Sequence, residues 1–116
     1  MKKLSIVTTT YKSEKYLRAY FENITELNGF SDFQIVLILN EPNDEENKIV
    51  AEFESKYLQN FKIVKVPRES IAASTNRGFN LAETEYITIA DVDDIKTKDC
   101  YTRQLQTLDQ LSCRKF

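Results

Sequence analysis

Three aspartates stand within four residues in the segment Asp91-Val92-Asp93-Asp94. Carboxylates this close repel one another, and their approach becomes favourable when a hard divalent cation such as Mg²⁺ or Mn²⁺ lies among them. Two carboxylates and a diphosphate would complete the coordination of such a cation. Aspartate is also common in turns and at helix N-termini, so capping is the alternative interpretation of Asp93 or Asp94.

Two earlier segments carry groups suited to a nucleotide. The hydroxyls and backbone amides of Thr8 to Tyr11 would bind it, with the Tyr11 ring near the base. Glu41 and Asn43 would hydrogen-bond a base edge or a ribose hydroxyl. Structural interpretations stay open for both, because threonine favours strands and Glu41-Pro42-Asn43-Asp44 is an ordinary turn before a helix.

Several classes of site are excluded by composition. The chain has no histidine, which removes an imidazole base, Ser-His triads and His-rich zinc sites. Gly29 and Gly78 are its two glycines, so neither G-x-G-x-x-G nor the P-loop motif is present. The net charge of -2 provides no excess of positive charge to attract nucleic acid or an anionic membrane surface, so we expect no nucleic-acid partner.

The elements that position these residues follow from the apolar pattern. Strands are predicted at four runs rich in β-branched residues, namely Leu4 to Thr9, Phe33 to Leu39, Phe61 to Val66 and Glu85 to Ala90. Apolar residues at helical spacing follow the first two strands, between positions 16 and 27 and between 49 and 58, with Ser13 and Asp44 as predicted N-caps. The third connection, Ser70 to Ala82, is short, and a fourth helix begins at about Thr97.

This alternation predicts an α/β fold: an open, mostly parallel sheet with helices on both faces. Ligands bind beyond the carboxyl ends of the strands in such sheets. We therefore expect the segments after the four strands to meet in one crevice. They are Thr8 to Tyr11, Asn40 to Asp44, Pro67 to Ser70 and Asp91 to Asp94. Gly78 inside a predicted helix, with the small residues Ala72 to Ser74, indicates close packing there.

Residues 1–116 are predicted to form one domain, because no repeat or linker interrupts them. Apolar runs near the N-terminus are too short for a signal peptide or a membrane span. Cys100 and Cys113 fall in one predicted helix, roughly 20 Å apart, and are expected to be free thiols. These features favour a cytoplasmic location, with association at the cytoplasmic side of a membrane left open.

The order of these segments resembles a family-2 glycosyltransferase of the GT-A fold over nearly the whole chain. Leu4 to Lys12 resembles the family's first strand and loop, and Asn40 to Asp44 occupies the place of its D-D-G-S-type loop. Ser70 to Gly78 resembles the G-x-A-x-A-R-N-x-G helix, and Tyr86 to Asp94 resembles the strand that ends in D-x-D-D. Thr75 stands where the family usually has arginine, and Asn40-Glu41 replaces an acidic pair.

The resemblance implies a Rossmann-like half-domain that binds the nucleotide-diphosphate sugar, with a UDP-sugar favoured. It implies Mn²⁺ or Mg²⁺ held by Asp93 and Asp91, and a sugar transferred to a glycan or lipid-linked acceptor in polysaccharide biosynthesis. The nucleotide-sugar-binding residues that it implies are Thr9, Tyr11, Glu41, Asn76 and Asp91. The base that deprotonates the acceptor is expected in a later segment that this chain lacks, so the catalytic residue is unknown.

Two other functional hypotheses stay open at this point. One is a non-catalytic nucleotide-binding or interaction domain, either a truncated relic or a piece that works only with a missing half, which would bind without turnover. A signalling receiver domain has a similar length and alternation, but its metal pocket needs acidic residues after the first strand, where this chain has Thr8 to Tyr11.

Overall fold

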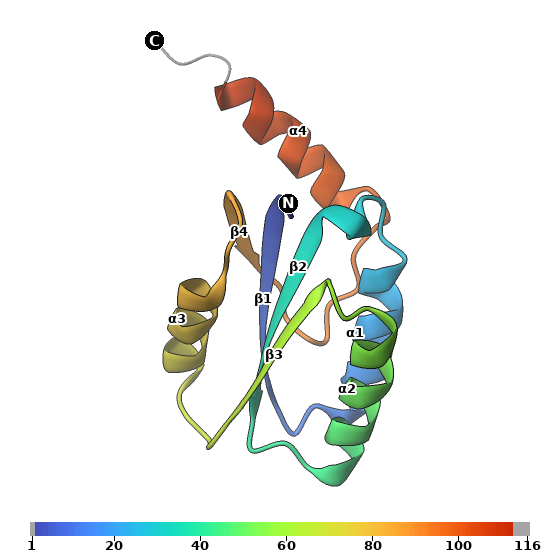
Figure 1. Ribbon diagram of the computed structural model, residues 1–116, viewed down its shortest axis with the longest axis vertical. Coiled ribbons are helices and arrows are strands. Elements are labelled where there is room, and N and C mark those ends of the chain that lie inside the picture. The colour runs from blue at the N-terminus through green and yellow to red at the C-terminus, as the bar shows by residue number, and fades with distance from the viewer. Residues whose placement is uncertain (1, 113–116) are drawn as a thin grey trace.

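The computed structural model describes residues 2–112, in which strands and helices alternate along the chain (Figure 1). The elements are β1 (Leu4–Tyr11), α1 (Glu14–Thr25), a 3₁₀ turn η1 (Phe30–Asp32), β2 (Phe33–Asn40), α2 (Asp44–Lys56), β3 (Phe61–Val66), α3 (Ile71–Leu81), β4 (Tyr86–Ile89) and α4 (Cys100–Ser112). All four predicted strands are confirmed. Cys113 lies outside the described residues, and Cys100 is a free thiol.

The four strands form one parallel sheet in the order β3-β2-β1-β4. The register aligns Tyr11, at the end of β1, with Asn40 at the end of β2, and Asn40 with Val66 at the end of β3. Three carboxyl ends therefore meet at one edge of the sheet. The order reverses after β3, because β4 pairs on the other side of β1, and such reversals open a crevice for ligands.

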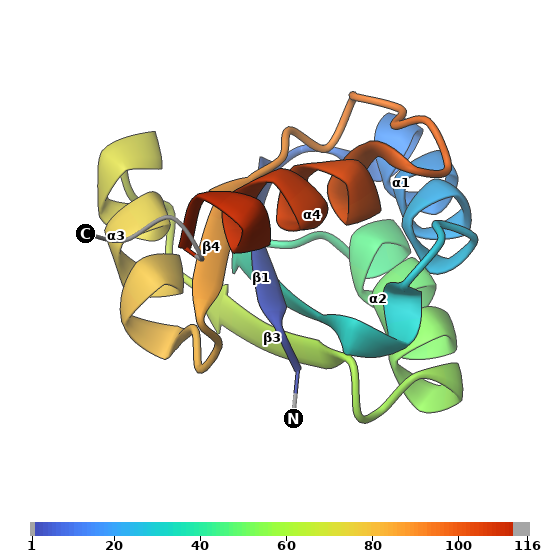
Figure 2. The ribbon, with the colours of Figure 1, turned by 90° about the horizontal axis from the view of Figure 1, so that it is seen from above.

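Helices cover both faces of the sheet, as predicted. Helices α1 and α2 lie on one face and α3 on the other (Figure 2). The larger core, on the α1 and α2 side, includes a stack of Phe21 on Phe53 with ring centroids 4.8 Å apart. A smaller cluster of Val7, Val36, Ile38 and Val66 forms the second core. Central strand β2 is buried from both sides, which explains its uninterrupted apolar run.

Gly78 brings α3 into close contact with β1. A Cβ atom at this position would lie 2.3 Å from Cγ1 of Val7, closer than carbon atoms can approach. The packing role expected for this glycine is confirmed. Helix α3 therefore lies against the sheet at a distance that an alanine could not keep.

The N-terminus of α2 corrects one prediction. The N-cap is Asn43, one residue before Asp44, because the Asn43 side chain accepts the Glu46 N–H at 2.8 Å. Glu46 accepts the Asn43 N–H in return, which completes a capping box. Ser13 holds the N-cap position of α1, but its hydroxyl donates to the Tyr11 carbonyl and makes no capping bond.

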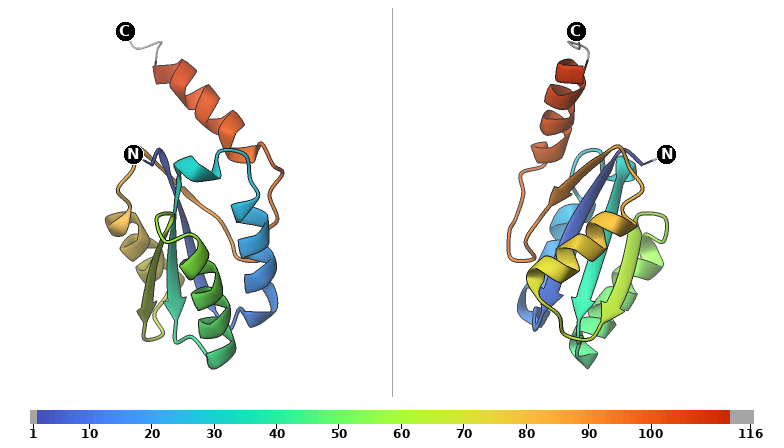
Figure 3. Two further views of the ribbon diagram at one scale, coloured as in Figure 1. Left: turned by 45° about the vertical axis from the view of Figure 1, so that its right-hand side comes forward. Right: turned by 90° about the vertical axis from the view of Figure 1, so that its left-hand side faces the viewer.

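The remaining corrections concern helix ends. Helix α2 ends at Lys56, so Leu58 lies beyond it and is exposed. Helix α4 begins at Cys100 rather than near Thr97, after a turn in which the Cys100 N–H donates to the Thr97 carbonyl. Figure 3 shows α4 extending away from the sheet. No helix among residues 2–112 is long and apolar enough to cross a membrane.

Candidate functional site

A cavity of about 450 Å³ lies at the carboxyl ends of β1, β2 and β3. Three of the four segments expected to converge contribute to it. Its lining residues are Thr9, Thr10, Tyr11, Ser13, Asn40, Arg68, Glu69, Ser70 and Ile71. Within residues 2–112, the Thr10 hydroxyl is buried and has no hydrogen-bond partner.

Tyr11 and Arg68 form a stacked pair in this lining. The guanidinium carbon of Arg68 lies 4.4 Å from the centroid of the Tyr11 ring, and the Lys12 ammonium lies 5.4 Å from it. Cations over an aromatic face are attracted by the ring quadrupole. The pair offers a flat surface and positive charge together. The sequence pointed to the Pro67 to Ser70 segment but not to Arg68 itself; a basic residue directly after a strand was the available signal.

A partly buried polar network includes two of the lining residues, Asn40 and Glu69. The amide of Asn40 donates to the Ser74 hydroxyl at 3.0 Å, and its oxygen accepts the Glu69 N–H at 2.9 Å. The Ser74 hydroxyl donates to the Glu69 carboxylate at 2.6 Å, and Arg77 donates to both oxygens of that carboxylate. The Arg77 guanidinium and, less strongly, the Ser74 hydroxyl hold the pKa of Glu69 below its usual value.

Backbone strain gathers at the same edge of the sheet. Lys12 and Glu41 directly follow the paired residues Tyr11 and Asn40, and both adopt left-handed conformations, with φ of 50° and 45°. Such conformations are costly for residues other than glycine and cluster at functional sites. Glu41 is exposed and is not one of the residues that line the cavity.

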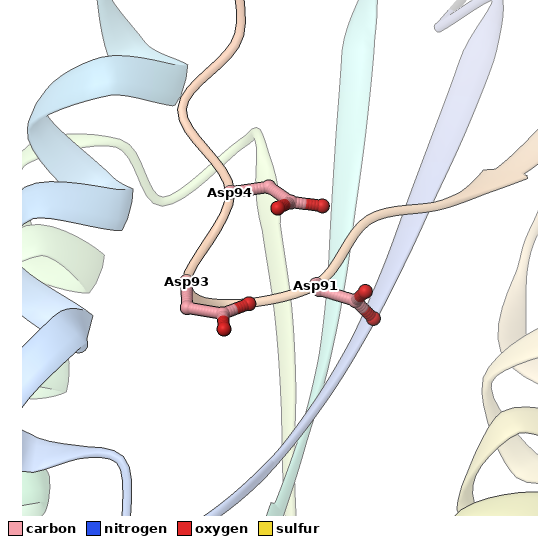
Figure 4. Close-up of side chains that lie close together, drawn as sticks. All are labelled: Asp91, Asp93 and Asp94. Carbon is pink, nitrogen blue, oxygen red and sulfur yellow. The ribbon is translucent and has the colours of Figure 1, made fainter.

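The three aspartates of the predicted acidic cluster lie close together in the structure (Figure 4). Carboxylate oxygens of Asp91, Asp93 and Asp94 all lie within 4.8 Å of one another, and all three residues are exposed. The donor set consists of carboxylate oxygens alone, which is the ligand chemistry that Mg²⁺ and Mn²⁺ prefer.

Neighbouring elements hold the acidic segment at both ends. The Thr8 hydroxyl donates to the Ala90 carbonyl at 2.8 Å, which places Asp91 beside the end of β1. Beyond the cluster, the Asn23 side chain of α1 donates to the Lys96 carbonyl and accepts the Lys96 N–H. The loop is thus fixed between β1 and α1, although its aspartates are not among the residues that line the cavity.

Asn76 lies apart from the other predicted site residues. It is exposed on α3, where it lines a separate hollow with Ala73, Arg77, Asn80 and Leu81. The structure therefore brings Thr9 and Tyr11 together in one cavity, gathers Asp91 with Asp93, and does not bring Asn76 to either group.

Comparison with known proteins decides the family. The sequence profile of glycosyl transferase family 2 matches residues 5–113. The chain belongs to this family. Family-2 relatives include an uncharacterised glycosyltransferase, MJ1057, of Methanocaldococcus jannaschii, with 33% identity over 79% of this chain and 32% of its own length. The minor teichoic acid biosynthesis protein GgaB of Bacillus subtilis is 27% identical over 91% of this chain and 12% of its own length.

Solved structures support the GT-A fold of this family-2 member. S. aureus TarS 1-349 superposes with a TM-score of 0.83 at 22% identity, over 93% of this chain and 32% of that one. The mannosyltransferase PcManGT of Pyrobaculum calidifontis, in complex with GDP-Man and Mn²⁺, gives a TM-score of 0.82 at 17% identity, over 91% and 32%. The chain thus spans about a third or less of the length of these relatives. Family membership replaces the receiver-domain interpretation.

Proposed function

We propose that this chain binds the nucleotide-diphosphate sugar for a glycosyl transfer, with the nucleotide in the cavity beyond β1, β2 and β3. The observation that carries the proposal is the pairing of this cavity with a carboxylate cluster on the neighbouring loop. Solved complexes of similar fold support it, since TarS binds UDP-GlcNAc and UDP, and PcManGT binds GDP-Man with Mn²⁺.

Each wall of the cavity has a proposed role. Tyr11 and Arg68 stack on the base or pair with its edge, and Thr9 hydrogen-bonds the nucleotide. Glu41, just outside the lining, accepts hydrogen bonds from the base or the ribose. For Asn76 to contact the donor, the sugar would have to extend to the hollow on the outer side of α3.

Asp93 and Asp91 are the proposed metal ligands, and a contact of Asp91 with the ribose is part of the same proposal. A bound Mn²⁺ or Mg²⁺ would neutralise the charge that develops on the departing diphosphate. The chain's own contribution is to hold the donor, because the Thr8 and Asn23 hydrogen bonds fix the loop that carries both carboxylates. We assign no catalytic base among these residues.

The names of similar proteins support a proposal for the wider role. Similar proteins include the minor teichoic acid biosynthesis protein GgaB of Bacillus subtilis and a teichoic acid poly(glycerol phosphate) polymerase of Staphylococcus epidermidis. We propose a glycan or lipid-linked acceptor in surface-polysaccharide synthesis, a UDP-sugar donor, and a cytoplasmic location. A non-catalytic nucleotide-binding domain is the alternative, and a measurement of turnover distinguishes the two.

Calorimetric titration of UDP and GDP, with Mn²⁺ and then with EDTA, tests the binding step. We expect metal-dependent binding of one nucleotide, lost in Asp93→Asn and retained in the matched control Asp32→Asn, an exposed aspartate directly before β2 at the opposite edge of the sheet. Binding that survives EDTA and Asp93→Asn would refute the metal site. Hydrolysis or transfer assays with UDP-GlcNAc then separate an enzyme from a non-catalytic binding domain.

A further inference from the structure

The loop between β3 and α3 carries Arg68 into the cavity. Its guanidinium lies against the Tyr11 ring, and within residues 2–112 no carboxylate forms an ion pair with it. The stacking energy of an exposed cation on a ring is small. The position of Arg68 therefore depends on how firmly the loop itself is held.

Glu69, the next residue, holds this loop at three points. Its backbone N–H donates to buried Asn40 of β2, and its carboxylate accepts from buried Ser74 and from Arg77, both on α3. Hydrogen bonds to a charged group are about twice as strong as neutral ones. Since Asn40 also donates to Ser74, the network closes on itself and joins β2, the loop and α3.

Both oxygens of the Glu69 carboxylate already accept hydrogen bonds from within the protein. One oxygen accepts from Ser74 and from the Arg77 Nε, the other accepts from the Arg77 terminal nitrogen, and the side chain is 18% exposed. Arg77 also neutralises a negative charge that would otherwise oppose an anionic nucleotide in the same cavity. These contacts suit a structural anchor rather than a base or a metal ligand.

We propose that Glu69 is a positioning residue for nucleotide binding, which acts by holding Arg68 over Tyr11. This inference rests on the proposed function, because it names how one wall of that nucleotide cavity is kept in place. Glu69 affects the ligand through Arg68 and does not bind it directly.

A double-mutant cycle tests this dependence. Affinity for UDP and GDP with Mn²⁺ is measured for wild type, Glu69→Gln, Arg68→Ala and the double variant. We expect Glu69→Gln to weaken binding about fivefold, the scale of one cation–aromatic contact, with no further loss in the Arg68→Ala background. Equal losses in both backgrounds, or an unchanged affinity in Glu69→Gln, would overturn the proposal.

Glu52→Gln is the matched control. Glu52 accepts two hydrogen bonds from Arg18 between α2 and α1, so the substitution also removes a bidentate arginine–glutamate pair. It is expected to leave nucleotide affinity unchanged. A loss as large as that in Glu69→Gln would show a general effect of removing such a pair, and would overturn the positioning role.

A second readout does not depend on the ligand. The NMR resonance of the Arg68 Nε–Hε group is expected to be displaced by the Tyr11 ring, and Tyr11→Leu identifies that displacement. Glu69→Gln should reduce it, and an undiminished displacement would refute the inference. If wild type binds neither nucleotide, the proposed function fails, while this spectrum still decides whether Glu69 positions Arg68.

Discussion

Gly78→Ala is expected to destabilise the protein, although alanine is the better helix former. In the interior of α3 the exchange alone would stabilise the helix by about 1 kcal/mol. The new methyl group, however, would lie 2.3 Å from Val7 Cγ1, and Val7 is fully buried in the middle of the sheet. Overpacking of this kind costs about 1–3 kcal/mol, and more when a strand must move. Because the contact is with a buried central strand, we take the upper part of that range, about 2–3 kcal/mol, which leaves a net loss of about 1–2 kcal/mol.

Urea or thermal unfolding followed by circular dichroism measures this loss. For a chain of this size, a loss of that magnitude lowers Tm by about 4–8 °C. The companion variant Val7→Ala removes the methyl group that clashes, at the cost of a small cavity. The double variant should therefore be more stable than the sum of the two single losses predicts. A stabilised Gly78→Ala protein, or strictly additive losses, would refute the close packing of α3 on β1.

Three further predictions concern polar groups near the site. Asn40→Asp should lower the free energy of unfolding by about 2 kcal/mol at pH 7, because a buried carboxylate cannot donate to Ser74 and lies near the charge of Glu69. An unchanged midpoint of urea unfolding would contradict the hydrogen-bond network. Asn43→Ala should cost about 1 kcal/mol by the same measurement, since it removes the α2 cap, and a loss near zero would argue against the capping box. The arginine partners of Glu69 and Glu52 lower the pKa of both carboxylates from 4.5. The stabilisation from these two pairs should therefore be present above pH 4.5 and lost as the pH falls through the lower pKa values of the folded state. In thermal scans at decreasing pH, Glu69→Gln should lose less stability than wild type.

The fold could be predicted largely because its strongest patterns are local. Uninterrupted β-branched runs such as Ile35 to Leu39 specify a strand buried on both faces, and their spacing leaves room for the connecting helices. The ends of the helices were predicted less accurately. Asn43 and Asp44 are equally good N-caps by residue type, and the choice depends on Glu46, which reaches back only to Asn43.

The sequence predicted which residue types the candidate site contains, but not all of the contacts between them. Asp91, Asp93 and Asp94 are neighbours in the sequence, so one turn brings them together. The stacking of Arg68 on Tyr11 depends on the path of the β3–α3 loop, which no local pattern encodes. The small residues Ser74 and Gly78 do mark the face of α3 that meets the sheet, and Asn76 stands two positions from each of them. Membership of the family came from the order of several motifs, none of which is specific alone.

The buried carboxylate of Glu46 has a consequence for motion at the site. One of its oxygens accepts the Ser13 N–H after β1, and the other accepts the Asn43 N–H after β2. Two loops that share one anion cannot open independently, since either movement would strand a buried charge. Hydrogen exchange should therefore be slow at Ser13 and Asn43 alike, and the two loops should open together.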